Sequence, residues 1–391
     1  MKYFNKISHI VWILSIVSLF TDVASEMLYP VLPIYLKSIG FSILVIGILE
    51  GLAEATAGLS KGYFGKLSDA SGKRVPFVKI GYILSAVSKP MIAIFAHPVW
   101  IFFSRTTDRF AKGVRTGARD AILSDEATPQ TKGTVFGFHR TMDTVGAAIG
   151  PALALLYLYF HPGNYIALFY FAFIPGVLAI LTTLFLKEKK HNSPKSNEKI
   201  HFFSFLKYWK QSPVIYRKLL IGLLIFTLFN SSDVFLLLKA KDAGLNDTHV
   251  IGIYIFYNLI YAFLAYPLGT IADKIGMKSM FILGLIMFSI VYFGFSINEN
   301  FYIYLILFFI YGIYAAATEG VSKAWISNIS NRKDTATAIG TYSALQSICT
   351  MIASSLAGVI WYELGAKVLF IVSGIMALVV ITYLLLMKIE E

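Results

Sequence analysis

Ionisable side chains stand in pairs within long apolar stretches of the first half of this chain. The members of three such pairs are four residues apart: Asp22 and Glu26, Glu50 and Glu54, and Arg105 and Arg109. Residues with this spacing share one face of a helix. Acids in an apolar setting can exchange protons, whereas arginines can hold an anionic group or act on a nearby acid. Among these acids, Asp22 and Glu26 are the leading candidates for proton carriers.

Other polar residues in apolar stretches extend this set. We expect proton exchange at Asp22, Glu26, Glu54, Asp108, Arg109 and Asp143. We expect contacts to a small-molecule ligand at Arg105, Glu50, Tyr29, Asn230, Asp233 and Asn258. With Lys89, Lys112 and Arg140 included, six acids and five fixed bases nearly balance in the first half. A mainly structural ion-pair network is therefore the alternative.

The composition indicates that the segments carrying these residues lie in a membrane. Of 391 residues, 57% are hydrophobic and 14% are charged, whereas an average soluble protein has roughly 25% charged residues. A chain of this kind needs lipid as its solvent. Disorder, a coiled coil and a disulfide scaffold are excluded, the last because Cys349 is the single cysteine.

Apolar segments long enough to cross about 30 Å of hydrocarbon as helices predict an all-α membrane protein with twelve transmembrane helices. The expected spans are 8–36, 43–64, 76–96, 98–122, 134–160, 164–186, 218–239, 249–271, 278–296, 300–325, 336–360 and 366–387. The first span lacks a small-residue cleavage site, so we expect a retained helix and not a signal peptide.

Lysine and arginine predict the orientation of the spans. They concentrate before span 1, in alternate loops and above all in the segment 187–217, while the other loops hold few. The positive-inside rule then places both termini and this segment in the cytoplasm of a multi-pass cell-membrane protein. We expect a six-helix bundle at 1–186, a cytoplasmic linker at 187–217 and a second six-helix bundle at 218–391.

One ten-residue pattern, G-x-x-x-D-x-x-G-x-[KR], occurs twice, at residues 65–74 and 269–278. A further match pairs Ser124 and Gly137 with Ser327 and Gly340, at an offset that differs by one residue. The chain is therefore predicted to consist of two pseudo-symmetric six-helix halves of like topology, as in transporters built from parallel repeats.

The repeated loops, the twelve spans and the basic central segment resemble the major facilitator superfamily. The resemblance covers essentially the whole chain and implies the major facilitator fold. It implies that the repeated loops act as a latch, with gating residues Gly65, Asp69, Lys73, Arg74, Gly269, Asp273 and Lys278. We expect the glycines to allow close helix packing and the aspartates to cap neighbouring helix N-termini.

Two further segments resemble signatures of the same family. Arg109, Lys112 and Gly113 are similar to a motif whose arginine is tied to proton coupling. The fifth span resembles the antiporter signature of drug and metabolite exporters, although Ala154 and Leu155 replace its final two glycines. Its expected gating residues are Gly146, Gly150 and Pro151. This resemblance favours export.

The repeat also pairs acids of the first half with amides of the second. Glu26 aligns with Asn230, Glu54 with Asn258 and Asp143 with Gln346. An amide keeps hydrogen bonding but cannot carry a proton. We infer that proton handling is concentrated in the first half, while the second half supplies neutral hydrogen bonds to a substrate.

Other classes of protein find little support in the sequence. It has no G-x-x-x-x-G-K-[ST] loop, no His/Cys cluster and no nucleophile–base arrangement, so we expect no cofactor, no metal and no enzyme activity. The leading prediction is a proton-coupled secondary transporter that exports a small organic solute by H⁺ antiport. An importer or exchanger of organic anions is the alternative within transport, and a non-transporting sensor or scaffold is the alternative outside it. The expected partners are a small-molecule substrate, protons and membrane lipid, without nucleic acid, and the protein is expected to be a monomer.

Overall fold

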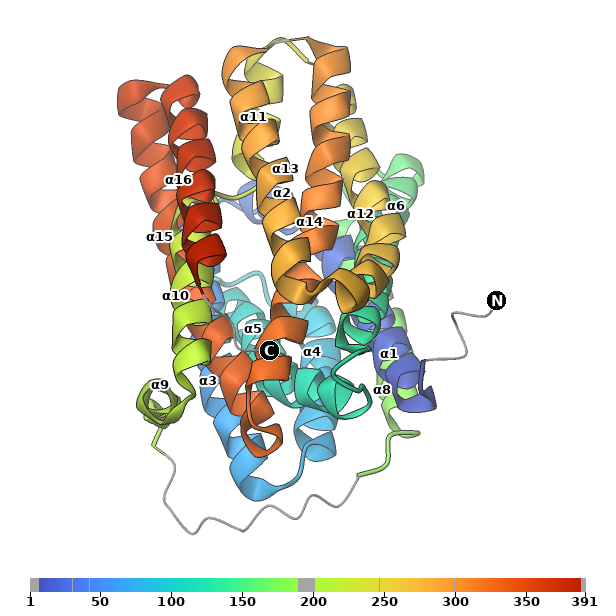
Figure 1. Cartoon of the computed structure of the whole chain (residues 1–391). Coiled ribbons are helices and arrows are strands. Elements are labelled where there is room, and N and C mark those ends of the chain that lie inside the picture. Colours follow the sequence, from blue (N-terminus) through green and yellow to red (C-terminus); the bar gives the residue numbers. More distant parts are fainter. Residues whose placement is uncertain are drawn as a thin grey trace. The chain divides into compact units, whose positions relative to one another are not determined.

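The computed structural model describes residues 7–29, 31–41, 43–188, 201–245, 247–298 and 300–387. Within these ranges the chain forms helices and no strand. The first half contains α1 (His9–Leu28), α2 (Val31–Ser38), α3 (Ile43–Ser71), α4 (Val75–Ile94), α5 (Pro98–Asp125), α6 (Lys132–Phe160), α7 (Tyr165–Phe171) and α8 (Phe173–Thr183) (Figure 1).

The second half follows two short helices, η2 (Ser204–Lys207) and α9 (Tyr208–Gln211). Its helices are α10 (Val214–Phe229), α11 (Val234–Asp242), α12 (Asp247–Ile275), α13 (Met277–Ile297), α14 (Phe301–Ile329), α15 (Thr335–Leu364) and α16 (Ala366–Leu386). A further short helix, η3 (Arg332–Asp334), precedes α15.

Every expected span corresponds to one of these helices or to a pair of them. The first span is α1 with α2, the sixth is α7 with α8, and the seventh is α10 with α11. Among the described residues, ten helical regions are long and apolar enough to cross a membrane. They do not include α5, which carries many charged residues, or α3, part of whose side chains lie outside the described set. The prediction of an all-α membrane protein is confirmed.

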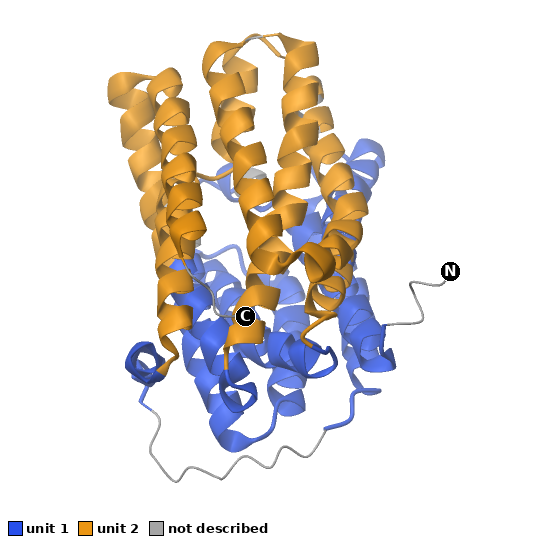
Figure 2. Cartoon of the chain, viewed as in Figure 1, with its two compact units in different colours: residues 1–128, 142–211, 331–347 blue, residues 129–141, 212–330, 348–391 orange. Residues whose placement is uncertain are grey.

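The described chain divides into two compact units (Figure 2). Unit 1 comprises Met1–Thr128, Met142–Gln211 and Asn331–Ser347, and unit 2 comprises Pro129–Thr141, Ser212–Ser330 and Ile348–Glu391. Each unit therefore includes a short segment from the other half of the sequence. Unit 1 includes the start of α15, and unit 2 includes the start of α6. The division into bundles at residues 187–217 stays a prediction, and residues 189–200 of that linker lie outside the described ranges.

The second glycine of each repeated motif makes a tight turn. Gly72 has a φ of 65° and Gly276 a φ of 90°, in the left-handed region that glycine enters without steric cost. These turns follow the last residues of α3 and α12, and α4 and α13 begin within a few residues. The motif thus fixes where two pairs of helices are joined.

Unit 2 has an aromatic core. Phe288 and Tyr292 stack with ring centroids 3.9 Å apart, and Phe295 stacks on Tyr304 at 4.8 Å. All four side chains are fully buried. Large rings packed in this way contribute apolar burial together with specific geometry. This core packs α13 against the first turn of α14.

Candidate functional site

Asp69, at the end of α3, contacts the beginning of α15. Its carboxylate accepts hydrogen bonds from the backbone N–H of Thr337 at 2.7 Å and from the Thr337 hydroxyl at 2.8 Å. The first N–H groups of a helix have no partner within that helix and favour a negative charge. Asp69 therefore caps a helix that begins 268 residues further along the chain.

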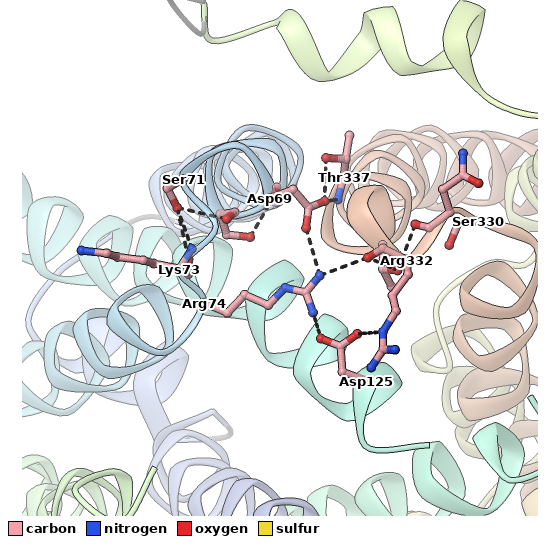
Figure 3. A network of polar contacts seen from close by, with 12 residues as sticks. Asp69, Ser71, Lys73, Arg74, Asp125, Ser330, Arg332 and Thr337 are labelled. Atoms are coloured by element: carbon pink, nitrogen blue, oxygen red, sulfur yellow. Dashed lines mark hydrogen bonds and ion pairs between the residues drawn. The ribbon is translucent and has the colours of Figure 1, made fainter. Parts of the chain in front are cut away.

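Arg74 joins this carboxylate to a second one. It donates to Asp69 at 3.2 Å and forms an ion pair with Asp125, at the end of α5. Arg332 also pairs with Asp125 at 3.3 Å, and its carbonyl accepts from Arg74 at 3.4 Å (Figure 3). We call Asp69, Arg74, Asp125, Arg332 and Thr337 the Asp69 network. It ties the ends of α3 and α5 to the segment before α15.

Burial raises the pKa of Asp69 to about 6. The nearby Arg74 guanidinium and the two hydrogen bonds from Thr337 oppose this rise. The carboxylate is therefore mostly ionised at neutral pH, in the form that accepts all of these hydrogen bonds.

Gly65 allows α3 and α15 to approach closely at this point. A Cβ atom on Gly65 would lie 2.4 Å from the carbonyl oxygen of Ala336 and 3.4 Å from the Cα of Gly340. Only a glycine fits such a contact between two backbones. The glycine and the aspartate of the motif therefore act on the same helix.

The second copy of the motif makes the equivalent contact with α6. Asp273 accepts from the backbone N–H groups of Gly133 and Thr134, both at 2.7 Å, and from the Thr134 hydroxyl at 2.5 Å. A Cβ on Gly269 would lie 2.2 Å from the carbonyl oxygen of Gly133 and 3.1 Å from the Cα of Gly137. We call this the Asp273 contact.

The two sets of contacts are related by the internal repeat. Gly65 and Asp69 act on the start of α15 as Gly269 and Asp273 act on the start of α6. In each case a helix end of one half holds a helix start of the other half. The sequence pointed to both aspartates and both glycines but not to their threonine partners, although Thr134 and Thr337 match at the offset that pairs Gly137 with Gly340.

The basic residues of the motif have different surroundings. Lys73 is exposed, whereas its neighbour Arg74 is 4% exposed. Lys278 donates to the carbonyl oxygens of Leu385 and Met387, at 3.4 and 2.9 Å. Sequence reasoning missed Asp125 and Arg332, for which the repeat holds no signal.

Several of the charges expected inside the membrane are paired in unit 1. Asp108 accepts from Lys89 at 2.5 Å and from the Ser85 hydroxyl at 2.7 Å, and lies 3.7 Å from Arg105. Glu54 pairs with Arg109 at 3.1 Å. Each of these two acids therefore has a basic partner. For these residues the geometry matches the alternative given by the sequence, a structural network of ion pairs.

Asp22 lies among other acids on α1 and α6, apart from the Asp108 and Glu54 ion pairs. Its electrostatic neighbours include Asp143 and Glu26, both acids, together with Lys112. Asp143 is 7% exposed, while Asp22 and Glu26 are partly exposed. Arg115 is a further basic neighbour, so bases as well as acids surround Asp22. The structure therefore brings three of the expected proton carriers together.

The glycines of α6 bring this helix against α1, beside the acids. A Cβ on Gly146 would lie 2.6 Å from the carbonyl oxygen of Leu19 and 3.1 Å from the Cβ of Asp22. A Cβ on Gly150 would lie 2.7 Å from the carbonyl oxygen of Val23. Pro151 follows inside the same helix. Small residues at these positions place the acids of α1 next to α6.

In unit 2, two of the polar residues expected to contact a ligand lie where the seventh span is broken. Asn230 follows α10 and Asp233 precedes α11, so neither lies within a helix. Asp233 accepts hydrogen bonds from the hydroxyls of Tyr257 at 3.1 Å and Tyr311 at 2.6 Å, and Asn230 donates to the Tyr314 hydroxyl at 2.9 Å. We call these five residues the Asp233 cluster.

Four other expected ligand contacts are not part of this cluster, and one of them, Arg105, lies near Asp108. Asn258 is buried and donates to the carbonyl oxygen of Tyr254, one turn earlier in its own helix. Tyr29 is 51% exposed at the end of α1. The side chain of Glu50 lies outside the described set. Among the described residues there is no group of three or more His, Cys, Asp or Glu side chains that could hold a metal ion.

The chain has apolar helices and two repeated halves, and a helix end of each half contacts a helix start of the other. These features define a multi-pass membrane protein of the carrier type. The family model of the Major Facilitator Superfamily matches residues 14–257 and 236–391, so this chain belongs to that superfamily of transporters. The resemblance inferred from the repeated motif is thereby confirmed.

Relatives and solved structures agree with this assignment. The chain is 33% identical, over 96% of its length and 94% of the relative's, to an uncharacterized MFS-type transporter of Methanocaldococcus jannaschii. Over 44% of its length and 43% of the relative's, it is 25% identical to the quinolone resistance protein NorA of Staphylococcus aureus. The human organic anion transporter MFSD10 has a TM-score of 0.80 at 15% identity, covering 96% of this chain and 98% of that one. FucP in its outward conformation has a TM-score of 0.77 at 9% identity, covering 96% and 97% of the two chains. The major facilitator fold is confirmed.

Proposed function

We propose that this protein is a proton-coupled secondary active transporter that exports a small organic solute from the cell by alternating access. The observation that carries the proposal is the pair of repeat-related contacts at Asp69 and Asp273. Each holds a helix end of one half against a helix start of the other through a few hydrogen bonds and one glycine contact. Contacts that are few, polar and symmetric suit a gate that must close and open once in every cycle.

The charge distribution indicates on which side of the membrane the gate lies. Both motifs carry basic residues and lie at the same side of the membrane as the basic linker by the positive-inside rule. This side is then the cytoplasmic one, with both termini, and the Asp69 network and the Asp273 contact close it. Opening it would require all of these contacts to break.

Export is favoured by two features. The glycine-rich fifth span resembles an antiporter signature, and its glycines pack against α1 next to Asp22. The partial relative NorA is named as a quinolone resistance protein. Asp22, Glu26 and Asp143 would take up protons from outside the cell and release them inside, which is the driving force for antiport.

An importer or exchanger of organic anions is the second candidate. It is favoured by the basic residues of α5 and by the name of the structural neighbour MFSD10. Arg105 and Arg109, however, already face Asp108 and Glu54. An anion would have to displace these carboxylates, which makes the anion reading the less favoured one.

Proton flux in inside-out membrane vesicles tests the proposed function. The vesicle interior is made acidic, an internal pH dye is followed, and lipophilic cations, organic acids and sugars are added in turn. We expect protein-dependent proton loss on addition of one class of compound. Silence across all classes, with a known proton-driven exporter responding in parallel, would overturn export and lead to uptake assays with organic anions.

Glu26→Gln should remove most of the coupling to protons. Glutamine keeps the size and hydrogen bonding of glutamate but cannot carry a proton. We expect substrate-triggered proton loss to fall at least about tenfold, the factor that corresponds to 1.4 kcal/mol. Glu363→Gln, which changes an exposed acid in the last turn of α15, is the matched control and should transport normally. A full rate in Glu26→Gln, with unchanged dependence on the pH gradient, would show that Glu26 is not a proton carrier.

A further inference from the structure

The Asp233 cluster contains a carboxylate without a basic partner. Among the described residues Asp233 forms no ion pair, and its hydrogen bonds come from the neutral hydroxyls of Tyr257 and Tyr311. In unit 1, by contrast, Asp108 and Glu54 each face a lysine or an arginine. An acid inside a membrane span is costly unless a charge of the opposite sign compensates it.

The charged neighbour of Asp233 on α14 is also an acid. Glu319, on α14, is an electrostatic neighbour of Asp233 and has the same sign. Glu319 itself is paired with Arg140. Because that pairing offsets the charge of Glu319, the uncompensated charge of the cluster is that of Asp233 itself, and it favours a positively charged occupant over a negative one.

A second acceptor lies in the same cluster. The Oδ1 atom of Asn230 is buried and has no hydrogen-bond partner among the described residues, while Nδ2 of this side chain donates to Tyr314. A buried acceptor without a donor costs free energy. A ligand that carries N–H groups would supply the missing donor to Asn230.

Aromatic rings complete the surroundings. The ring centroids of Tyr257 and Tyr311 are 5.1 Å apart, and those of Tyr311 and Tyr314 are 5.2 Å apart. Ring faces attract cations, and more strongly where water is scarce. Asp233 remains partly exposed, whereas the three tyrosines are buried, so an occupant meets Asp233 first and reaches the rings when the helices move apart during transport. The break between α10 and α11 is also the kind of discontinuous helix at which transporters bind substrates.

We propose that the Asp233 cluster binds the organic cation that this protein transports, a protonated amine or a related aromatic cation with N–H groups. Asp233 contacts the positive charge, Asn230 Oδ1 accepts an N–H group, and the rings of Tyr257, Tyr311 and Tyr314 pack on the apolar part. This inference rests on the proposed transport function and names the substrate class of the same carrier.

Binding to the purified protein in detergent tests the site without transport. The probe is ethidium, an aromatic cation with amino groups, followed by fluorescence polarisation. Tetraphenylphosphonium and tetraphenylborate, which have nearly the same size and shape but opposite charge, serve as competitors. We expect tetraphenylphosphonium to displace ethidium at concentrations at least about tenfold lower than tetraphenylborate. Equal displacement by the anion, or stronger displacement, would overturn the inference.

Asp233→Asn isolates the charge, because asparagine can still accept from one tyrosine hydroxyl and donate to the other. We expect ethidium affinity to fall at least about tenfold, Asp233→Glu to retain most of it, and Tyr311→Phe to reduce it about fivefold or less. Asp242→Asn, an exposed acid at the end of α11, is the matched control. If Asp233→Asn binds ethidium normally but loses proton flux, Asp233 holds a proton and not the substrate, and the inference fails.

The result separates this inference from the proposed function. Normal charge-dependent binding without proton flux would refute H⁺ antiport and leave the cation site in place. Proton-coupled transport that does not depend on Asp233 would refute the cation site and leave the transporter.

Discussion

Replacing Gly269 by alanine should open the gate at the Asp273 contact. The new Cβ would lie 2.2 Å from the carbonyl oxygen of Gly133 and 3.0 Å from its carbonyl carbon. A backbone cannot yield as a flexible side chain can, so α12 and α6 would have to separate. Overpacking of this kind costs about 1–3 kcal/mol, which corresponds to a shift in a two-state population of about 5- to 150-fold.

Cysteine labelling measures this shift. Cys349→Ser removes the native thiol, and Ala272→Cys places a reporter at a fully buried position on α12 near Asp273. We expect a membrane-impermeant maleimide applied from the cytoplasmic side to label the reporter at least about fivefold faster when Gly269 is alanine. Transport should fall in parallel, because the closed state is disfavoured.

The same helix provides a control. A Cβ on Gly252 would meet no atom within 4 Å, so Gly252→Ala adds a methyl group to α12 without a clash. Labelling in this variant should match that of the parent. If Gly269→Ala also labels at the parental rate and transports normally, the close contact between α6 and α12 has no role in gating.

Arg74→Ala should destabilise the protein strongly and weaken the other gate contact. Arg74 lies between the carboxylates of Asp69 and Asp125, and all three side chains are no more than 5% exposed. Removal of one partner from a buried ion pair leaves an uncompensated charge and costs about 3–5 kcal/mol. Because Arg332 and Thr337 continue to donate to the two acids, we expect a loss near the lower limit of this range, measured as the free energy of unfolding in detergent.

The neighbouring lysine is a matched control. Lys73 has the same charge and is exposed, so Lys73→Ala should change the free energy of unfolding by less than about 0.5 kcal/mol. Arg74→Lys should lie in between, because a lysine keeps the charge but cannot reach two carboxylates with a planar fork. Equal stabilities for Arg74→Ala and Lys73→Ala would show that the Asp69 network contributes nothing.

These two predictions differ in how far the sequence alone could make them. The repeat places Gly65 and Gly269, and Asp69 and Asp273, at equivalent positions, because duplicated segments form the same turns and meet equivalent helices. It cannot separate Lys73 from Arg74. The two residues are adjacent and carry the same charge, but their side chains point in different directions. Arg74 points to two acids, while Lys73 points to solvent.

The intramembrane charges show the same limit. Sequence spacing places Asp22 and Glu26 on one helical face, and Arg105 and Arg109 on another. It does not reveal that Glu54 has an arginine beside it while Asp233 has two tyrosines. The proposal that protons are handled mainly in the first half stays a prediction. The Glu26 variant tests it with an acid of the first half, and the Asp233 variants test it with an acid of the second half.

By itself the sequence determined that this protein needs a membrane as its solvent, that it is helical, that it is built from two like halves and that each half carries one copy of the glycine–aspartate motif. These properties depend on composition, hydrophobic length and repetition, which are local or can be read by aligning the chain with itself. The tertiary structure decided which acids are paired, which arginine is buried and which tyrosines surround Asp233. Those contacts join residues up to 268 positions apart, and they depend on which helix faces meet, which no local pattern encodes.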